Sequence, residues 1–413
     1  MLINKIGYSY NDLTLVPEII SEVSSRSQCN PFVKDNFLPI FTAPMTSVCN
    51  EENIDKFLVN GITPIIPRNI SIEKRIELMY KQQWVALSLN EFKDLFINKY
   101  EERINYFKTA AYFICVDIAN GHMHSLYNMC RDAKVLANKH NYKLTIMTGN
   151  IANPDTYEWI IKFNDENNIK IIDYIRVGIG GGSGCITTSN VSAHYPQASL
   201  IDECYKIKKY WKNYTSKEIV PYIIADGGIR NYDHVIKALA LGADYVMIGS
   251  LFAQCIESAG IKLNKDINQK ISLKFPIERY RDFELDEKGN WWAYYTDEFI
   301  TKLIQPWQTG HIEKYNEHIE SLKEKKFIGH IDVKFFGMAS ADGQKSISGE
   351  KTKTAEGITK YLPVKYTLQG WVKNMTSYLR SAMSYTNCFT LKDFIGKPML
   401  IINSISEIQA VNK

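Results

Sequence analysis

Cys185 is the residue with the clearest capacity for chemistry, because it ends a glycine-rich loop. Five glycines occur between positions 178 and 184, and the apolar run 171–175 before them predicts a buried strand. Glycine lets a ligand approach the main chain closely, and a thiolate beside backbone N–H groups and hydroxyls can act as a nucleophile. The loop therefore indicates a covalent catalytic site. For this segment taken alone, a glycine-rich turn with a buried, inert cysteine is the alternative.

Two further glycine-containing turns each follow an apolar run directly. One is Asp226-Gly227-Gly228 and the other is Gly249-Ser250. Backbone N–H groups at such turns bind anions, and loops after consecutive strands commonly hold a phosphate. We therefore expect these residues to bind a phosphate, with a hydroxyl added by Ser183; tight turns without a ligand are the alternative.

Eight short apolar runs alternate with helix-like stretches, which predicts a parallel α/β fold. Closure into a (β/α)8 TIM barrel is the most economical arrangement of eight such units. The polar residues Asp117 and Asn150 and the glycine turns all fall just after a run, where a barrel builds its active site. The runs are 39–43, 63–66, 84–89, 112–117, 143–147, 173–177, 222–226 and 245–248.

Four segments in a fixed order resemble the IMP dehydrogenase / GMP reductase family, and the closest similarity is to GMP reductase. They are Gly178–Thr188, Tyr195–Gln197, Ile224–Arg230 and Lys237–Ser250. The resemblance implies one (β/α)8 barrel domain over 1–413, without the regulatory module pair often inserted after the second strand. The family pattern leaves 260–330 unexplained, as an insertion after the eighth strand that contains a predicted helix over 311–325. The resemblance also implies a mobile active-site loop over 341–360.

The resemblance further implies roles for individual residues. Cys185 would attack purine C2, and Thr187 and Glu356 would handle the proton of the departing ammonia. The implied substrate-binding residues are Ser183, Asp226, Gly227, Gly228, Gly249, Ser250, Gly337, Met338 and Ala339. The implied cofactor is NADPH, or alternatively NAD, and its residues are Asp117, Asn120, Gly121, Asn150 and Met338. A potassium ion would bind the carbonyl groups of Gly180, Gly182 and Cys185.

Two other functions stay open beside a GMP reductase. An IMP dehydrogenase would use NAD and water, and a non-catalytic relative would only bind a purine nucleotide. The segments 117–121 and 195–197 favour the reductase, and 341–354 holds neither the arginine nor the tyrosine that activates water in the dehydrogenase. An Arg279-Tyr280 pair occurs in the insertion instead. Four departures from the family pattern leave fine specificity open: Thr46, Arg68, Phe336 and the sequence Cys185-Ile-Thr-Thr-Ser189, where the family usually has Cys-Thr-Thr-Arg.

Composition gives little indication of a macromolecular partner. The formal net charge is +4 over 413 residues, which gives no electrostatic reason to expect nucleic acid or an anionic membrane. The eight cysteines show no CxxC spacing, which is typical of free thiols in a reducing compartment. We expect a cytoplasmic protein without a membrane span, and the resemblance implies a homotetramer.

Overall fold

Eight parallel strands form one sheet, and each coincides with a run that the sequence predicts. The computed structural model describes residues 6–99, 102, 111–215, 218–264, 272–273, 280–295, 326–349 and 354–403. The strands are β2 Ile40–Thr42, β3 Ile65–Ile66, β4 Trp84–Leu87, β5 Ala111–Val116, β6 Lys143–Ile151, β7 Tyr174–Val177, β8 Tyr222–Asp226 and β9 Tyr245–Ile248.

The sheet closes on itself. Its strand order is β2-β9-β8-β7-β6-β5-β4-β3, and all of these pairs are parallel. The two end strands meet where Thr63 N donates to Ile40 O at 3.1 Å and Thr42 N donates to Thr63 O at 3.0 Å. The predicted (β/α)8 barrel is therefore confirmed.

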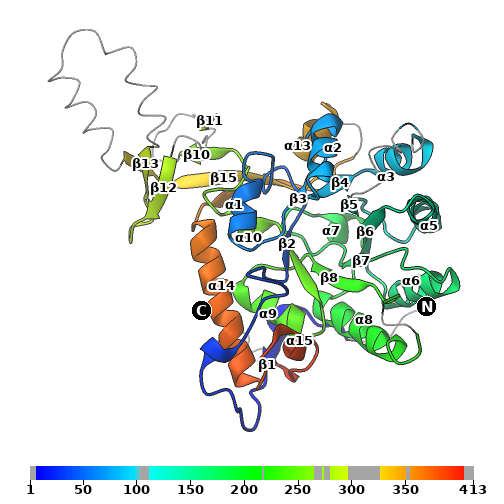
Figure 1. Cartoon of the computed structure of the whole chain (residues 1–413). Coiled ribbons are helices and arrows are strands. Elements are labelled where there is room, and N and C mark those ends of the chain that lie inside the picture. The colour runs from blue at the N-terminus through cyan, green and yellow to red at the C-terminus, as the bar shows by residue number, and fades with distance from the viewer. Residues whose placement is uncertain are drawn as a thin grey trace.

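A helix follows each strand and covers the outside of the barrel (Figure 1). The eighth helix comes late in the chain, because the short α10 Ser250–Ala253 and the insertion precede it. Its Trp371 stacks on Tyr232 of the seventh helix, which places it in the last position of the ring. The helices are α1 Ile54–Val59, α2 Ile72–Tyr80, α3 Leu89–Lys93 continued by η3 Asp94–Asn98, α5 His124–Lys139, α6 Pro154–Glu166, α8 Gln197–Trp211, α9 Tyr232–Ala240 and α14 Leu368–Tyr385.

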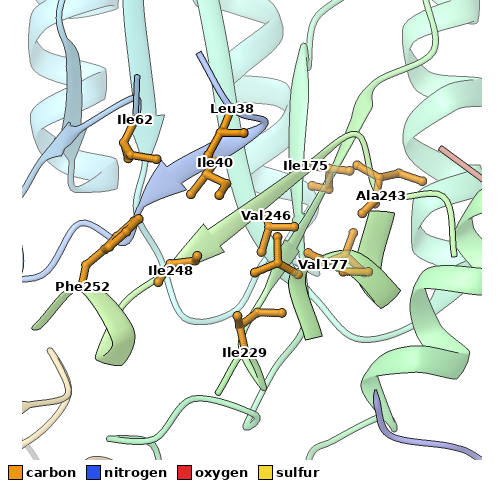
Figure 2. Packing of buried hydrophobic residues seen from close by; sticks show 14 of the residues in the cluster. Leu38, Ile40, Ile62, Ile175, Val177, Ile229, Ala243, Val246, Ile248 and Phe252 are labelled. Atoms are coloured by element: carbon orange, nitrogen blue, oxygen red, sulfur yellow. The ribbon is translucent and has the colours of Figure 1, made fainter. Parts of the chain in front are cut away.

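Alternate side chains of each strand enter two separate cores, as the two-residue period of a strand requires. In β9, Val246 and Ile248 belong to the large core between strands and helices, whereas Met247 belongs to the barrel interior. Figure 2 shows part of the outer core, where Val246 and Ile248 lie near Ile40 of the neighbouring strand. The interior is aromatic at its base, where Trp84 contacts Phe41 and Tyr174 edge-on.

Two antiparallel sheets lie beside the barrel, at the side away from α5 and α6 (Figure 1), and both contain strands of the segment 260–330. Lys262 pairs with Val333, so the beginning of the insertion lies beside the strand that directly follows it. The indole of the buried Trp291 donates to Val364 O at 3.1 Å and ties the second sheet to the main chain after β16. The strands are β10 Lys262–Asn264, β11 Ser272–Leu273, β12 Tyr280–Leu285, β13 Trp291–Tyr295, β14 Lys326–Gly329, β15 Ile331–Phe336 and β16 Thr359–Pro363. The predicted helix over 311–325 lies outside the described residues.

The segment 341–360 differs from the continuous loop that we expect from the sequence. Helix α13, Ala341–Ser348, begins where the Ser340 side chain accepts from Gly343 N and ends at Gly349, whose φ is 78°. Ser at the start and a left-handed Gly at the end are the usual capping residues of a helix. The loop prediction is therefore wrong for 341–348 and for 359–360, where β16 begins, while the mobility of the segment stays a prediction.

The described segments near the two ends of the chain pair with each other. In the two-stranded sheet, Leu13 lies opposite Ile402. Throughout the described part of the chain, no helix has the length and apolar character needed to cross a membrane. The elements are η1 Tyr10–Asp12, β1 Leu13–Leu15, η2 Arg26–Gln28, α15 Leu391–Phe394 and β17 Leu400–Ile402.

Candidate active site

Thr187 contacts both Cys185 and Glu356, although Glu356 comes 169 residues after Thr187. The Cys185 thiol donates to Thr187 Oγ1 at 3.1 Å, and Thr187 N donates back to Cys185 Sγ at 3.5 Å. The Thr187 hydroxyl donates to Glu356 Oε2 at 3.4 Å, which is long for such a bond. Catalytic hydrogen bonds often tighten only when substrate binds. The three side chains form one hydrogen-bonded path from a thiol to a carboxylate.

Backbone pairing sets this arrangement. Ile186 N donates to Glu356 O at 3.0 Å and Ile358 N donates to Gly184 O at 2.9 Å, which makes Cys185 and Gly357 an antiparallel pair. The loop after β7 and the segment after α13 therefore lie strand against strand. Main-chain hydrogen bonds, and not only side chains, fix the position of Glu356 relative to Cys185.

Glycines allow a third segment to approach the same point. A Cβ atom at Gly337 would lie 2.5 Å from Gly184 O, and one at Gly184 would lie 2.8 Å from Gly337 N. Both distances are shorter than any side chain tolerates, so only glycine fits at either position. The Gly337-Met338-Ala339 turn thus lies directly against the loop that carries Cys185. Ala339 O accepts from Glu356 N at 3.1 Å and completes the contact.

Two acidic residues predicted for different ligands share one cation at the barrel mouth. Arg176 Nη1 donates to Asp117 Oδ1 at 2.6 Å, and Arg176 Nε donates to Asp226 Oδ2 at 2.9 Å. Asn150 Nδ2 also donates to Asp226 Oδ2, at 2.7 Å. Burial alone would lower the pKa of Arg176, but the carboxylates of Asp226 and Asp117 raise that pKa well above its ordinary value. The group is a buried, charged network.

The predicted phosphate loops also meet. The hydroxyls of Ser183 and Ser250 lie 3.1 Å apart, although they follow different strands. The Gly228 N–H is already engaged, because it donates to Gly181 O at 3.0 Å. A phosphate here would therefore find the two serine hydroxyls and the Gly249 turn rather than the Gly228 N–H.

The predicted cofactor side lies at the ends of β5 and β6. Gly121 N donates to Asn150 O at 2.9 Å, and Asn120 Oδ1 accepts from His122 N at 3.0 Å. Arg68 Nη1 donates to Asp117 O at 3.3 Å. Arg68 Nε and the neighbouring Asn69 Oδ1 are buried without a hydrogen-bond partner among the described residues. A spare cationic donor and a spare acceptor beside Asp117 suit a polar, anionic cofactor.

Two other predicted contacts have partial structural counterparts. Thr46, which replaces the family's usual acid, donates to Met338 Sδ at 3.8 Å and lies 3.3 Å from the Ser346 hydroxyl on α13. The Gly182 carbonyl accepts from Cys185 N at 3.0 Å, which occupies one of its two lone pairs. The potassium site at Gly180, Gly182 and Cys185 stays a prediction.

Cys185 differs from the other cysteines in exposure. It is half-buried, whereas the remaining seven thiols are all buried. Burial raises the pKa of Cys115, on the barrel interior, to about 12. A buried thiol with a raised pKa is a poor nucleophile, so exposure singles out Cys185.

Arg176 is the residue of this site to which the sequence assigns no role. It stands between Ile175 and Val177 in an apolar run directly before the glycine loop. A charge inside a buried strand needs a partner, and that is the available signal. The partners themselves are 59 and 50 residues away along the chain and cannot be read from it.

Comparison with known proteins identifies the family of this chain. The IMP dehydrogenase / GMP reductase domain matches residues 7–272. A GMP reductase of Staphylococcus epidermidis is 31% identical over 271 residues, which cover 63% of this chain and 75% of the relative. A GMP reductase of Helicobacter pylori is 29% identical over 295 residues, covering 68% and 81%. One of Caenorhabditis elegans is 25% identical over 291 residues, covering 70% and 59%. The chain belongs to the IMP dehydrogenase / GMP reductase family.

Proposed function

We propose that this protein is a GMP reductase, which converts GMP to IMP and ammonia with NADPH through a covalent adduct at Cys185. The observation that carries the proposal is the path from the Cys185 thiol through Thr187 to Glu356. Relatives named GMP reductase support the same reaction. A nucleophile, a hydroxyl and a carboxylate in contact can bind a ring carbon and move a proton in one place.

The proton follows the hydrogen bonds between these side chains. Thr187 Oγ1 accepts the Cys185 proton while its own proton passes to Glu356. The sulfur then forms a bond to purine C2. The proton returns along the same path to the amino group on C2, the C2–N bond breaks and ammonia leaves. When bound beside Asp117, Asn120, Gly121, Asn150 and Met338, the cofactor would supply a hydride to C2. Breakage of the C2–S bond would then release IMP and return Cys185 as a thiolate.

Each ligand has its own set of residues in the proposal. Ser183, Gly249 and Ser250 hold the nucleotide phosphate, with Gly227 and Gly228 shaping the adjacent turn. Asp226 and the 337–339 turn hold the ribose and base. The cofactor lies against Asp117, Asn120, Gly121, Asn150 and Met338, beside Arg68. The spare donor and acceptor at Arg68 and Asn69 support this side for a phosphorylated dinucleotide.

Two assays on the purified protein test the proposal. One contains GMP and NADPH, the other IMP and NAD, both with potassium, and cofactor absorbance is followed. We expect NADPH consumption with equimolar ammonia, and a loss of about 10³-fold or more in Cys185→Ala. NADH formation with XMP would instead establish an IMP dehydrogenase. Silence in both assays, with GMP or IMP still bound, would establish a non-catalytic nucleotide-binding protein.

The proposal also covers a bound potassium ion, the oligomeric state and the cellular location. We infer a potassium-activated, cytoplasmic homotetramer. Omitting potassium from the first assay tests the ion, and light scattering tests the assembly against a chain mass of 47.5 kDa. A monomeric mass would exclude the homotetramer, and a rate that is independent of potassium would exclude activation by potassium. Neither result would contradict the proposed reaction.

A further inference from the structure

Arg176 lies where the apolar interior of the barrel gives way to the mouth. Its neighbours Ile175 and Val177 both belong to the outer core, so the alternation of β7 directs Arg176 inward. Its guanidinium also contacts Cys115 Sγ, at 3.8 Å, on the interior side. Arg176 is 8% exposed and therefore cannot serve as a solvated surface charge.

The guanidinium holds two carboxylates from different strands through different nitrogens. Nη1 is bound to Asp117, just after β5, and Nε is bound to Asp226, at the end of β8. Each carboxylate uses one oxygen for this bond, which leaves the second oxygen of each outside the ion pairs. One planar group thus binds both carboxylates, and Asn150 Nδ2 adds a second bond to Asp226 Oδ2.

We propose that Arg176 is the positioning residue that orients Asp226 toward the nucleotide and Asp117 toward the cofactor, so that both half-sites depend on one side chain. The inference rests on the proposed function, which assigns the two carboxylates to the two ligands. Arg176 itself touches neither ligand and acts only through its partners.

Lysine is the informative replacement here. A Cβ atom at Gly149 on β6 would lie 2.5 Å from Arg176 O and 2.7 Å from Arg176 Cβ, so the glycine lets β6 pack closely against the main chain at position 176 and does not itself select an arginine. Lysine carries the same charge but has a single nitrogen, and a point charge cannot reproduce two bonds from a rigid fork. Arg176→Lys therefore keeps the charge and removes the geometry.

Binding of each ligand is the direct test. Titration calorimetry on full-length Cys185→Ala, which cannot turn over, gives separate dissociation constants for GMP and NADPH. We expect Arg176→Lys in this background to weaken both by about tenfold or more, because charge-assisted hydrogen bonds are the strong ones. Asp226→Asn should weaken mainly GMP and Asp117→Asn mainly NADPH. Arg176→Gln repeats the test if the lysine variant does not fold.

Arg75→Lys is the matched control. Arg75 is equally buried and also binds through several nitrogens, to Glu91 and to the carbonyls of Ile70 and Ala86. The Arg75→Lys variant should change the melting temperature as Arg176→Lys does, but it should leave the dissociation constants for GMP and NADPH unaltered. If Arg176→Lys leaves either constant unchanged while Cys185→Ala binds both ligands, the positioning role is overturned and the proposed function stands. If Cys185→Ala and the wild type bind neither ligand, the proposed function fails and this inference with it.

Discussion

The two ends of the barrel both contain buried ion pairs, but they are organised differently. At the base, Lys208 pairs with Asp244, whose Oδ2 also accepts from Ile223 N at 2.7 Å. The same unit occurs two repeats earlier, where Asp173 pairs with Lys134 and accepts from Ile146 N. In each unit an aspartate before one strand joins the preceding strand to a helix lysine. At the mouth, Arg176 joins carboxylates of two non-adjacent strands.

This difference in organisation distinguishes the ion pairs at the base, which stabilise the fold, from those at the mouth, which we expect to contact a ligand. A base aspartate is satisfied by local groups, so its unit repeats with the βα units of the barrel. The mouth carboxylates are bound instead by the side chains of Arg176 and Asn150, in the region where barrel enzymes bind substrates. We therefore expect substitutions at the base to change stability and substitutions at the mouth to change binding or turnover.

The largest effect should come from Lys208→Met at the base. It leaves the Asp244 carboxylate without its cation, and the Lys208 side chain is only 3% exposed. Breaking such a pair costs about 3–5 kcal/mol of unfolding free energy. Denaturant unfolding measures this loss, and the turnover of the folded fraction should stay at the wild-type value.

Lys206→Met is its control on the same helix. Lys206 pairs with Asp202, but its side chain is 70% exposed, so the cost should be about 1 kcal/mol or less. Equal losses in the two variants, or a Lys208→Met protein with normal stability and low turnover, would break the comparison.

A second, smaller effect is expected from Thr187→Val at the mouth. Removing the hydroxyl interrupts the path between Cys185 and Glu356, and acid–base groups of this kind contribute about 10² in rate. Steady-state assays should show a fall in kcat with KM for GMP nearly unchanged, and thermal unfolding should not change. Thr187→Ser keeps the hydroxyl and should recover most of the rate; a serine variant as slow as the valine one would remove the hydroxyl from the mechanism.

The smallest effect concerns Asp342 on α13, which is more exposed than either set of buried pairs. Hydrogen bonds from Thr359 and Lys334 lower its pKa. The carboxylate therefore stabilises the fold above its ordinary pKa, and this contribution is lost as pH falls through the lowered folded value. Asp342→Asn should cost about 1 kcal/mol or less at pH 7. The unfolding curves of variant and wild type should begin to converge below roughly pH 4 and should coincide below the lowered folded pKa of Asp342. A difference that persists below that pKa would assign the effect to packing.

The sequence predicts the barrel and the contents of its mouth well, because these depend on local signals. Apolar runs and the turns after them are enough to locate all eight strands. The positions of Cys185, Thr187 and Glu356 follow from motifs, and the structure brings these three together. Their catalytic roles stay a prediction.

Long-range pairing explains what the sequence does not predict. Helix α13 is polar, and it is attached to the rest of the fold by Lys334 and Thr359, which lie on strands before and after it. Only its capping residues, Ser340 and Gly349, were available as local evidence. Likewise, Arg176 stands out as a charge in an apolar run, but its partners become visible only when β5, β7 and β8 are side by side.

The exposure of Cys185 has a practical consequence for the whole molecule. Since the seven other thiols are buried, an alkylating reagent applied to the folded chain should attach once, at the mouth of the barrel. Counting that single label by intact-mass spectrometry would report the fraction of correctly folded chains in a preparation. A nucleotide bound at the mouth should slow this labelling, and the fall in labelling rate would measure the fraction of sites that are occupied. Cys185 can therefore serve as a built-in reporter for ligand screening.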